Sequence, residues 1–146
     1  MSDPLYRRDL LRLAADAQGA GRLADPDATG HAFNPACGDR VTVDISMDAG
    51  RITAIAHETK ACVLAQASAS ILGSALLGAD HVRVTELRAE VAAMLVGGQP
   101  PARPFEAYGA FRGAIDYDSR HRCVLIPIDA VLDALEQNVA TDETST

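Results

Sequence analysis

An alternating stretch near the middle of the chain constrains the fold more than any other feature. In residues 41–47, VTVDISM, apolar side chains fill every second position and polar side chains fill the positions between. This period of two is typical of a strand with one buried and one exposed face. A turn at 48–50 and a returning stretch at 51–58 predict an antiparallel hairpin, and residues 30–35 predict a further strand ending at Pro35.

The rest of the chain carries helical patterns. Apolar side chains recur every three or four residues in the segments 4–16, 62–78, 84–98 and 123–140. Thr85 is the expected N-cap of the third helix, and Pro127 fits only the first turn of the last one. Residues 99–119 predict an irregular or partly helical stretch. We therefore expect an α+β fold in which a small three-stranded antiparallel sheet packs against a layer of helices.

Length, charge and cysteine number narrow the class of protein. The 146 residues suit one domain, which we expect to span 1–140, followed by a disordered tail at 141–146. A net charge of −7 argues against nucleic acid as a partner, and no apolar run is long enough for a membrane span. An odd number of cysteines and a charged N-terminal sequence predict reduced thiols in the cytoplasm.

The three cysteines all fall at predicted ends of elements. Cys37 lies in the bent segment NPACGDR, two positions before Asp39, while Cys62 and Cys123 each begin a predicted helix. A free cysteine most often packs as a small apolar side chain. A glycine-flanked corner beside a carboxylate is not a core position, however, and a helix N-terminus lowers the pKa of a thiol. These four residues are therefore candidate metal ligands or nucleophiles.

Three thiolates and one carboxylate suit a thiophilic metal. They would complete a tetrahedral site for zinc or for an iron–sulfur cluster, and the residues alone do not choose between the two. A carboxylate binds such metals less tightly than a fourth thiolate would. The set therefore predicts a site that opens more easily than a closed structural zinc site.

Three segments resemble the cysteine segments of the U-type iron–sulfur assembly scaffolds, the IscU/SufU/NifU N-terminal family. They are NPACGD (34–39), KACVLAQASASIL (60–72) and SRHRCVLIPIDAVLDAL (119–135). The resemblance implies the SufE/NifU-like fold, with the site at one exposed end. It also implies that Cys37, Asp39, Cys62 and Cys123 ligate a metal ion or a [2Fe–2S] cluster. Cys123 would accept persulfide sulfur from a pyridoxal-phosphate (PLP)-dependent cysteine desulfurase.

The SufU-like branch is the more similar one. ISC-type scaffolds carry a histidine directly before the last cysteine, where this chain has Arg122. SufU-type proteins carry a basic residue there, an arginine at the position of Arg120, and a longer segment such as 99–119. That resemblance implies a zinc-dependent sulfur acceptor and relay, a carrier rather than a stand-alone enzyme. Its partners would be a SufS-like desulfurase and downstream cluster carriers or apo-proteins. Ala61 departs from the glycine usual before the second cysteine.

Two alternatives and several auxiliary residues remain. The protein is alternatively an IscU-like [2Fe–2S] scaffold or, in a different class, a zinc-stabilised interaction module without sulfur chemistry. His121 could replace Asp39 on a metal, although an exposed histidine is the commoner outcome. Arg120 and Arg122 either orient a thiolate or persulfide by charge or form a solvated basic patch. The remaining predictions are surface positions for His31, His57 and His81, close packing for Ser68 and Ser70, and a docking patch or core position for Leu5 and Tyr6.

Overall fold

The computed structural model describes residues 8–35 and 38–144. Its elements, in order, are α1 (Arg8–Asp16), β1 (Ala28–Asn34), β2 (Asp39–Asp48), β3 (Arg51–Lys60), α2 (Val63–Ala75), α3 (His81–Leu95), the 3-10 helix η2 (Glu106–Ala114) and α4 (Asp118–Thr144). The strands form one antiparallel sheet in the order β1-β2-β3. The predicted α+β fold, with three strands against a layer of helices, is confirmed.

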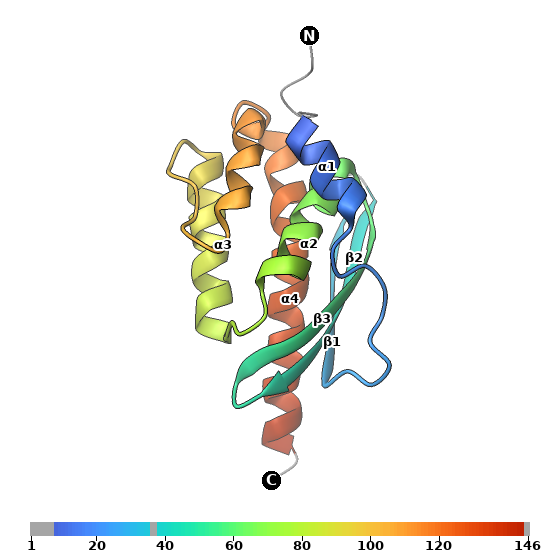
Figure 1. The fold of residues 1–146 in the computed structure, drawn as a ribbon. Coiled ribbons are helices and arrows are strands. Elements are labelled where there is room, and N and C mark those ends of the chain that lie inside the picture. Colours follow the sequence, from blue (N-terminus) through green and yellow to red (C-terminus); the bar gives the residue numbers. More distant parts are fainter. Residues whose placement is uncertain (1–7, 36–37, 145–146) are drawn as a thin grey trace.

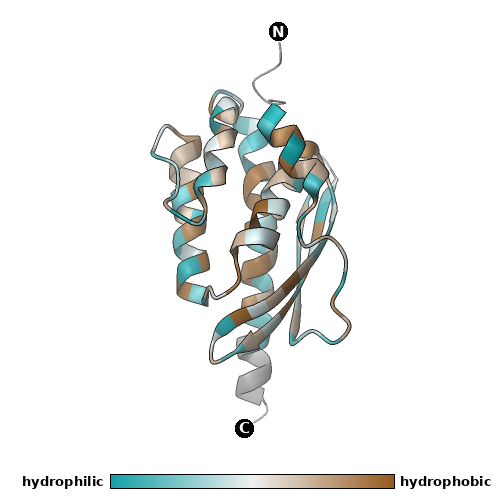
Figure 2. Ribbon diagram, in the orientation of Figure 1, coloured by the Kyte–Doolittle hydropathy of each residue, from teal (hydrophilic) through white to brown (hydrophobic). Residues whose placement is uncertain are grey.

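The helices form two layers on one face of the sheet. The helix α4 packs against β1 and β2, and α2 packs against β3, α1 and α4. Helix α3 contacts α4 and η2 on the side away from the sheet (Figure 1). Hydrophobic positions gather along α2 and along the strands that face it (Figure 2). The alternating side chains Val41, Val43 and Ile45 point into this core, as the period of two predicts.

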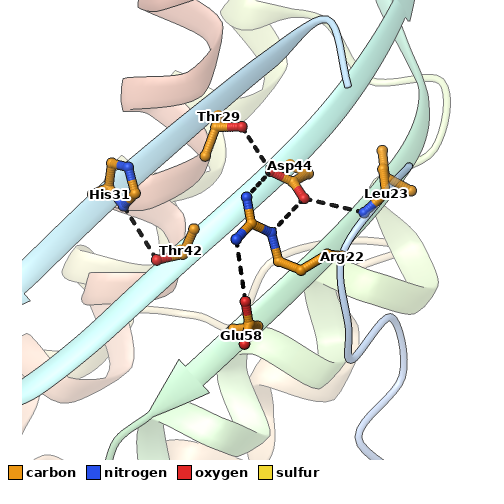
Figure 3. Close-up of polar contacts among 7 residues, drawn as sticks. All are labelled: Arg22, Leu23, Thr29, His31, Thr42, Asp44 and Glu58. Carbon is orange, nitrogen blue, oxygen red and sulfur yellow. Dashed lines mark hydrogen bonds and ion pairs between the residues drawn. The ribbon is translucent and has the colours of Figure 1, made fainter. Parts of the chain in front are cut away.

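A loop covers part of the other face of the sheet. Asp44 points away from the core, yet it is 0% exposed because residues 17–27 lie over it. Figure 3 shows the reason: Arg22 Nε donates to Asp44 Oδ2 at 2.7 Å, and the Thr29 hydroxyl donates to Oδ1 at 2.7 Å. The hydrogen bond from Arg22 is the main cause that lowers the pKa of Asp44. The carboxylate therefore stays ionised and holds the loop in place.

His57 is a second anchor of this loop, and its predicted surface position is wrong. It is 6% exposed, and its Nε2 lies 2.8 Å from the carbonyl oxygen of Gln18. A carbonyl only accepts, so Nε2 carries the proton. The backbone of His57 also pairs with Gly19 and Gly21, which covers that part of the β3 edge. Burial lowers the pKa of His57, so the ring is neutral in the folded protein.

His57→Gln should flatten the acid side of the stability profile. Because the folded-state pKa lies below the usual value of about 6.5, the unfolded chain takes up the proton first as the pH falls. The wild type should then lose up to about 1.4 kcal/mol of unfolding free energy per pH unit below 6.5, until the folded-state pKa is reached. Urea unfolding at pH 7.5, 6.5 and 5.5 measures this. His31→Gln, an exposed position, should follow the wild type; parallel curves for His57→Gln and the wild type would contradict the assignment.

Several helix boundaries differ from their predicted positions. Helix α3 begins at His81, and Asp80 is its N-cap, accepting from the backbone N–H of Arg83 at 2.8 Å, so the predicted cap at Thr85 is wrong. Helix α4 begins at Asp118 rather than at 123. It ends at Thr144, so residues 141–144, predicted to be disordered, are helical.

Other features agree with the sequence or lie outside the described residues. The stretch 99–119 is partly helical, as predicted, through η2 and the start of α4. The first residues of the predicted N-terminal helix, including Leu5 and Tyr6, lie outside the described residues. Among the described helices, none combines the length and apolar character that crossing a membrane requires. The single-domain boundary at 140 stays a prediction.

Candidate metal and thiol site

Three of the four predicted ligands meet at the end of the sheet opposite the β2–β3 hairpin. Asp39 begins β2, Cys62 lies directly before α2, and Cys123 lies in the second turn of α4. One ligand atom from each of these residues lies within 4.8 Å of the other two. Cys37 lies outside the described residues, so its part in the site stays a prediction. The convergence comes from the pairing of β2 with β3, which ends beside Lys60, and from α4 packing on β2 and on α2.

Asp39 is the feature that points to a cation. Its side chain is buried, and Oδ1 accepts the backbone N–H of Cys62 at 3.3 Å. Within the described part of the chain, Oδ2 is buried and has no hydrogen-bond partner. Buried polar atoms are nearly always paired, because losing water without a replacement costs free energy. A carboxylate oxygen left unpaired beside two thiols fits a metal site.

The thiol of Cys62 has a pKa that is lowered toward neutral pH. The hydrogen bond from Cys123 is the main cause that lowers its pKa to about 7, and the backbone N–H groups of Leu64 and Ala65 add to this effect. Burial and the charge of Asp39 act in the opposite direction. The N–H groups belong to the first turn of α2, for which Cys62 is the N-cap residue. The prediction that Cys62 begins a helix is confirmed.

Cys123 sits differently from its predicted place. The sequence predicts it at a helix start, where the helix dipole would favour the thiolate, but α4 begins at Asp118 and Cys123 lies inside it. The side chain is 1% exposed and donates a hydrogen bond to Cys62. Its surroundings are therefore set by Cys62 and the core rather than by a helix terminus.

The auxiliary residues are not part of the ligand cluster. Nε2 of His121 lies 2.9 Å from the carbonyl oxygen of Ala114 and 3.1 Å from that of Ile115, so the ring holds the end of η2 to α4. Arg122 is exposed and Arg120 is partly exposed. The predicted roles of these three side chains in metal binding or sulfur transfer stay predictions.

A row of exposed side chains borders the site on the outer face of the sheet. Phe33 pairs with Arg40 across β1 and β2, and Arg40 pairs with Lys60 across β2 and β3. The guanidinium of Arg40 lies 5.3 Å from the centre of the Phe33 ring, and all three side chains are exposed. We call these three residues the cationic row. Sequence reasoning missed it, because only the strand register brings the three residues side by side.

Sequence reasoning also underestimated Ser68. It is fully buried, and its hydroxyl contacts the Tyr108 hydroxyl at 2.8 Å and the Val124 carbonyl at 2.7 Å. A serine facing the core from an apolar helix is the one signal that pointed to it, because a buried hydroxyl needs partners. Close packing, the predicted role, is therefore incomplete as a description of Ser68.

Comparisons with known proteins identify the family of this chain. The family model for the NifU-like N terminal domain matches residues 5–123. The zinc-dependent sulfurtransferase SufU of Bacillus subtilis is 25% identical over 97% of this chain and 93% of its own length. The iron–sulfur cluster assembly scaffold protein IscU of Thermotoga maritima is 23% identical over 91% of this chain and 94% of its own.

A solved structure of a NifU-like protein has the same fold as this chain. The nitrogen-fixing NifU-like protein (N-terminal) from Brucella abortus superposes with a TM-score of 0.89 and is 34% identical, over 94% of this chain and 96% of that one. The family expected from the three cysteine segments is therefore confirmed. This chain belongs to the NifU-like N-terminal domain family and is a protein of iron–sulfur cluster assembly.

Proposed function

We propose that this protein accepts sulfur from a PLP-dependent cysteine desulfurase of the SufS type and passes it to cluster carriers or apo-proteins. The observation that carries the proposal is the buried Asp39 oxygen beside the thiols of Cys62 and Cys123, which has no hydrogen-bond partner among the residues that the structure describes. The printed name of the Bacillus subtilis relative, a zinc-dependent sulfurtransferase, supports zinc as the resident metal. A cytoplasmic location, where thiols stay reduced, belongs to the same proposal.

Asp39, Cys62 and Cys123, together with Cys37, would hold the zinc ion. Sulfur and carboxylate oxygen are both ligands that zinc accepts in a tetrahedral site. When bound, zinc would keep the thiols deprotonated at neutral pH. The hard carboxylate is the weakest of the four ligands, and it is the one we expect to leave when the site opens.

Cys123 is the proposed acceptor of sulfur. Its thiolate attacks the outer sulfur of the persulfide carried by the desulfurase cysteine. A new S–S bond forms on Cys123, the S–S bond of the desulfurase persulfide breaks, and its electron pair leaves with the desulfurase thiolate. The sulfur atom changes carrier without net oxidation or reduction, so no further reactant is needed.

Trapping the transferred sulfur tests the proposal. The protein is mixed with desulfurase and cysteine, the thiols are alkylated, and the peptide that contains Cys123 is analysed by mass spectrometry. The expected result is one additional sulfur atom on that peptide and faster sulfide release when a reductant is present. If neither is observed, the relay function is wrong, and a metal-stabilised interaction module becomes the better description.

A second candidate function uses the same residues for a different cargo. The printed name of the Thermotoga maritima relative is that of a cluster assembly scaffold, and a [2Fe–2S] cluster accepts the same sulfur ligands. Metal analysis of the purified protein, followed by an absorption spectrum after anaerobic addition of iron and sulfide, distinguishes the two. Zinc at one equivalent with no cluster spectrum supports the relay; a stable cluster spectrum supports the scaffold.

The cationic row marks the surface where we expect the desulfurase to dock. It borders the site, and it places two positive charges, Arg40 and Lys60, side by side in a chain with a net charge of −7. A partner surface with carboxylates beside an apolar contact would complement Arg40 and Phe33 together. Docking there would bring the desulfurase persulfide to the end of the sheet at which Cys123 lies.

Lys60→Glu should weaken desulfurase stimulation by about tenfold at low salt, because it reverses one charge of the cationic row. The loss should appear mainly as a higher protein concentration for half-maximal stimulation, and it should shrink at high salt. Arg51→Glu is the matched control: it makes the same charge change at the other end of β3, next to the hairpin. Equal effects of the two substitutions would show that net charge, rather than the cationic row, governs the encounter.

A further inference from the structure

Two buried hydroxyls join three elements directly behind Cys123. Tyr108 on η2 and Ser68 on α2 are fully buried, and their hydroxyl oxygens lie 2.8 Å apart. The Ser68 hydroxyl also lies 2.7 Å from the carbonyl oxygen of Val124, the residue that follows Cys123 in α4. The pair therefore ties η2 to α2 and α2 to α4 next to the acceptor thiol.

Counting hydrogens gives this chain of bonds a direction. The carbonyl of Val124 can only accept, so Ser68 uses its single hydroxyl proton there. Ser68 must then accept from Tyr108, whose hydroxyl also lies 3.4 Å from the backbone carbonyl of Ser68. Burial raises the pKa of Tyr108, so the phenol keeps the proton it donates. The donors run from Tyr108 through Ser68 to Val124, and each bond polarises the next.

A proline interrupts the hydrogen-bond ladder of α4 in the turn that Ser68 contacts. Pro127 lies inside the helix, one turn after Cys123, and it has no N–H to contribute to the helix ladder. In this same turn, the carbonyl oxygen of Val124 accepts a hydrogen bond from the Ser68 hydroxyl of α2. Because α2 begins directly after Cys62 and α4 contains Cys123, the Ser68 bond links the two helices that hold the two thiols.

We propose that Ser68 and Tyr108 are positioning residues for the thiol of Cys123. Through the backbone of α4, they set the distance of the Cys123 sulfur from Cys62 and Asp39. The role rests on the proposed function, in which Cys123 is the acceptor and part of the metal site. Tyr108 comes from the stretch 99–119, so this stretch acts as a support for the site and not only as a connection between α3 and α4.

Ser70 supplies a matched control on the same helix. It is also buried, but its hydroxyl accepts the backbone N–H of Gln18 at 3.1 Å and thus faces the loop instead of α4. Ser68→Ala and Ser70→Ala remove the same atom from two buried positions of α2. Tyr108→Phe removes only the phenol oxygen, which makes it the variant that retains the core if Ser68→Ala fails to fold.

Metal affinity and stability are measured together on the purified protein. We expect Ser68→Ala and Tyr108→Phe each to weaken Zn²⁺ or Co²⁺ binding by about tenfold in a chelator competition, the size typical of residues that orient ligands. The double variant should bind no more weakly than Ser68→Ala, because Tyr108 acts through Ser68. Ser70→Ala should lose stability in urea unfolding while its metal affinity stays at the wild-type level.

A second readout needs no metal. In metal-free protein that carries Cys37→Ser, the rate at which diamide joins Cys62 to Cys123 reports how often the two sulfurs meet. It should fall several-fold in Ser68→Ala and Tyr108→Phe and stay unchanged in Ser70→Ala. If both variants match Ser70→Ala in metal affinity and in coupling rate, the hydroxyls only stabilise the fold and the positioning role is overturned. If the wild type binds neither metal, the proposed function fails, and the coupling rate alone still decides the positioning role.

Discussion

Replacing Cys123 by serine is expected to return desulfurase turnover to the level measured without this protein. Serine nearly preserves the volume of a side chain that is 1% exposed, so the core should remain packed. Its hydroxyl stays protonated at neutral pH, however, and offers neither a nucleophile for the persulfide nor a soft ligand for a metal. The substitution therefore removes the chemistry of the position while it keeps the shape.

The same substitution should also weaken metal binding by more than the roughly 10–100-fold that changes around the ligands cause. Sulfide release in the presence of reductant measures turnover, and chelator competition measures affinity. Cys62→Ser is the informative comparison, because it removes one candidate ligand and leaves the proposed acceptor thiol. A Cys123→Ser protein that loses metal and stability but still stimulates the desulfurase would show that Cys123 has a purely structural role.

The parts of the fold set by nearby residues were predictable from the sequence. The alternation around Val43 depends on neighbours two positions apart, and the hairpin turn follows it directly. Cys62 at a helix start also follows from local pattern. Such elements form because local preference and burial agree over a short stretch.

Cys123 shows how a local rule fails. Pro127 suggested a helix that begins just before it, since proline is best tolerated in a first turn. In the structure the helix begins at Asp118, whose carboxylate suits a helix N-terminus, and Pro127 is accommodated in the interior. The carbonyl oxygen of Val124, in the turn before Pro127, accepts a hydrogen bond from Ser68, a residue far away in the sequence. No pattern within α4 predicts that contact.

Contacts across long sequence distances explain the remaining differences. The hairpin pattern predicts exposed positions for Asp44 and His57. Both are buried, because the loop between α1 and β1, which is distant in the sequence, covers them. Of the four candidate ligands predicted from residue types, Asp39, Cys62 and Cys123 do meet, whereas Cys37 lies outside the described residues. The buried Asp39 oxygen that has no partner among the described residues is the observation that favours a metal site, and its burial depends on packing that only the folded structure supplies.

Asp39→Cys and Asp39→Asn should move zinc affinity in opposite directions. A fourth thiolate would bind zinc more tightly than the carboxylate by about tenfold or more, equivalent to about 1.4 kcal/mol. The longer zinc–sulfur bond partly compensates for the shorter cysteine side chain. Asparagine keeps the shape and the oxygen that accepts the N–H of Cys62, but it loses the charge and should bind zinc more weakly.

Sulfur transfer should fall in the cysteine variant even though its metal site is the tighter one. If the carboxylate is the ligand that leaves, closing the site with a fourth thiolate keeps the metal saturated and keeps Cys123 from the desulfurase persulfide. Zinc exchange, followed with a chromogenic chelator, and persulfide formation on Cys123 are measured on the same preparation. Should Asp39→Cys exchange zinc slowly and still take up sulfur at the wild-type rate, opening of the site at Asp39 is not part of the transfer, and the buried carboxylate serves only to hold the metal and the N–H of Cys62.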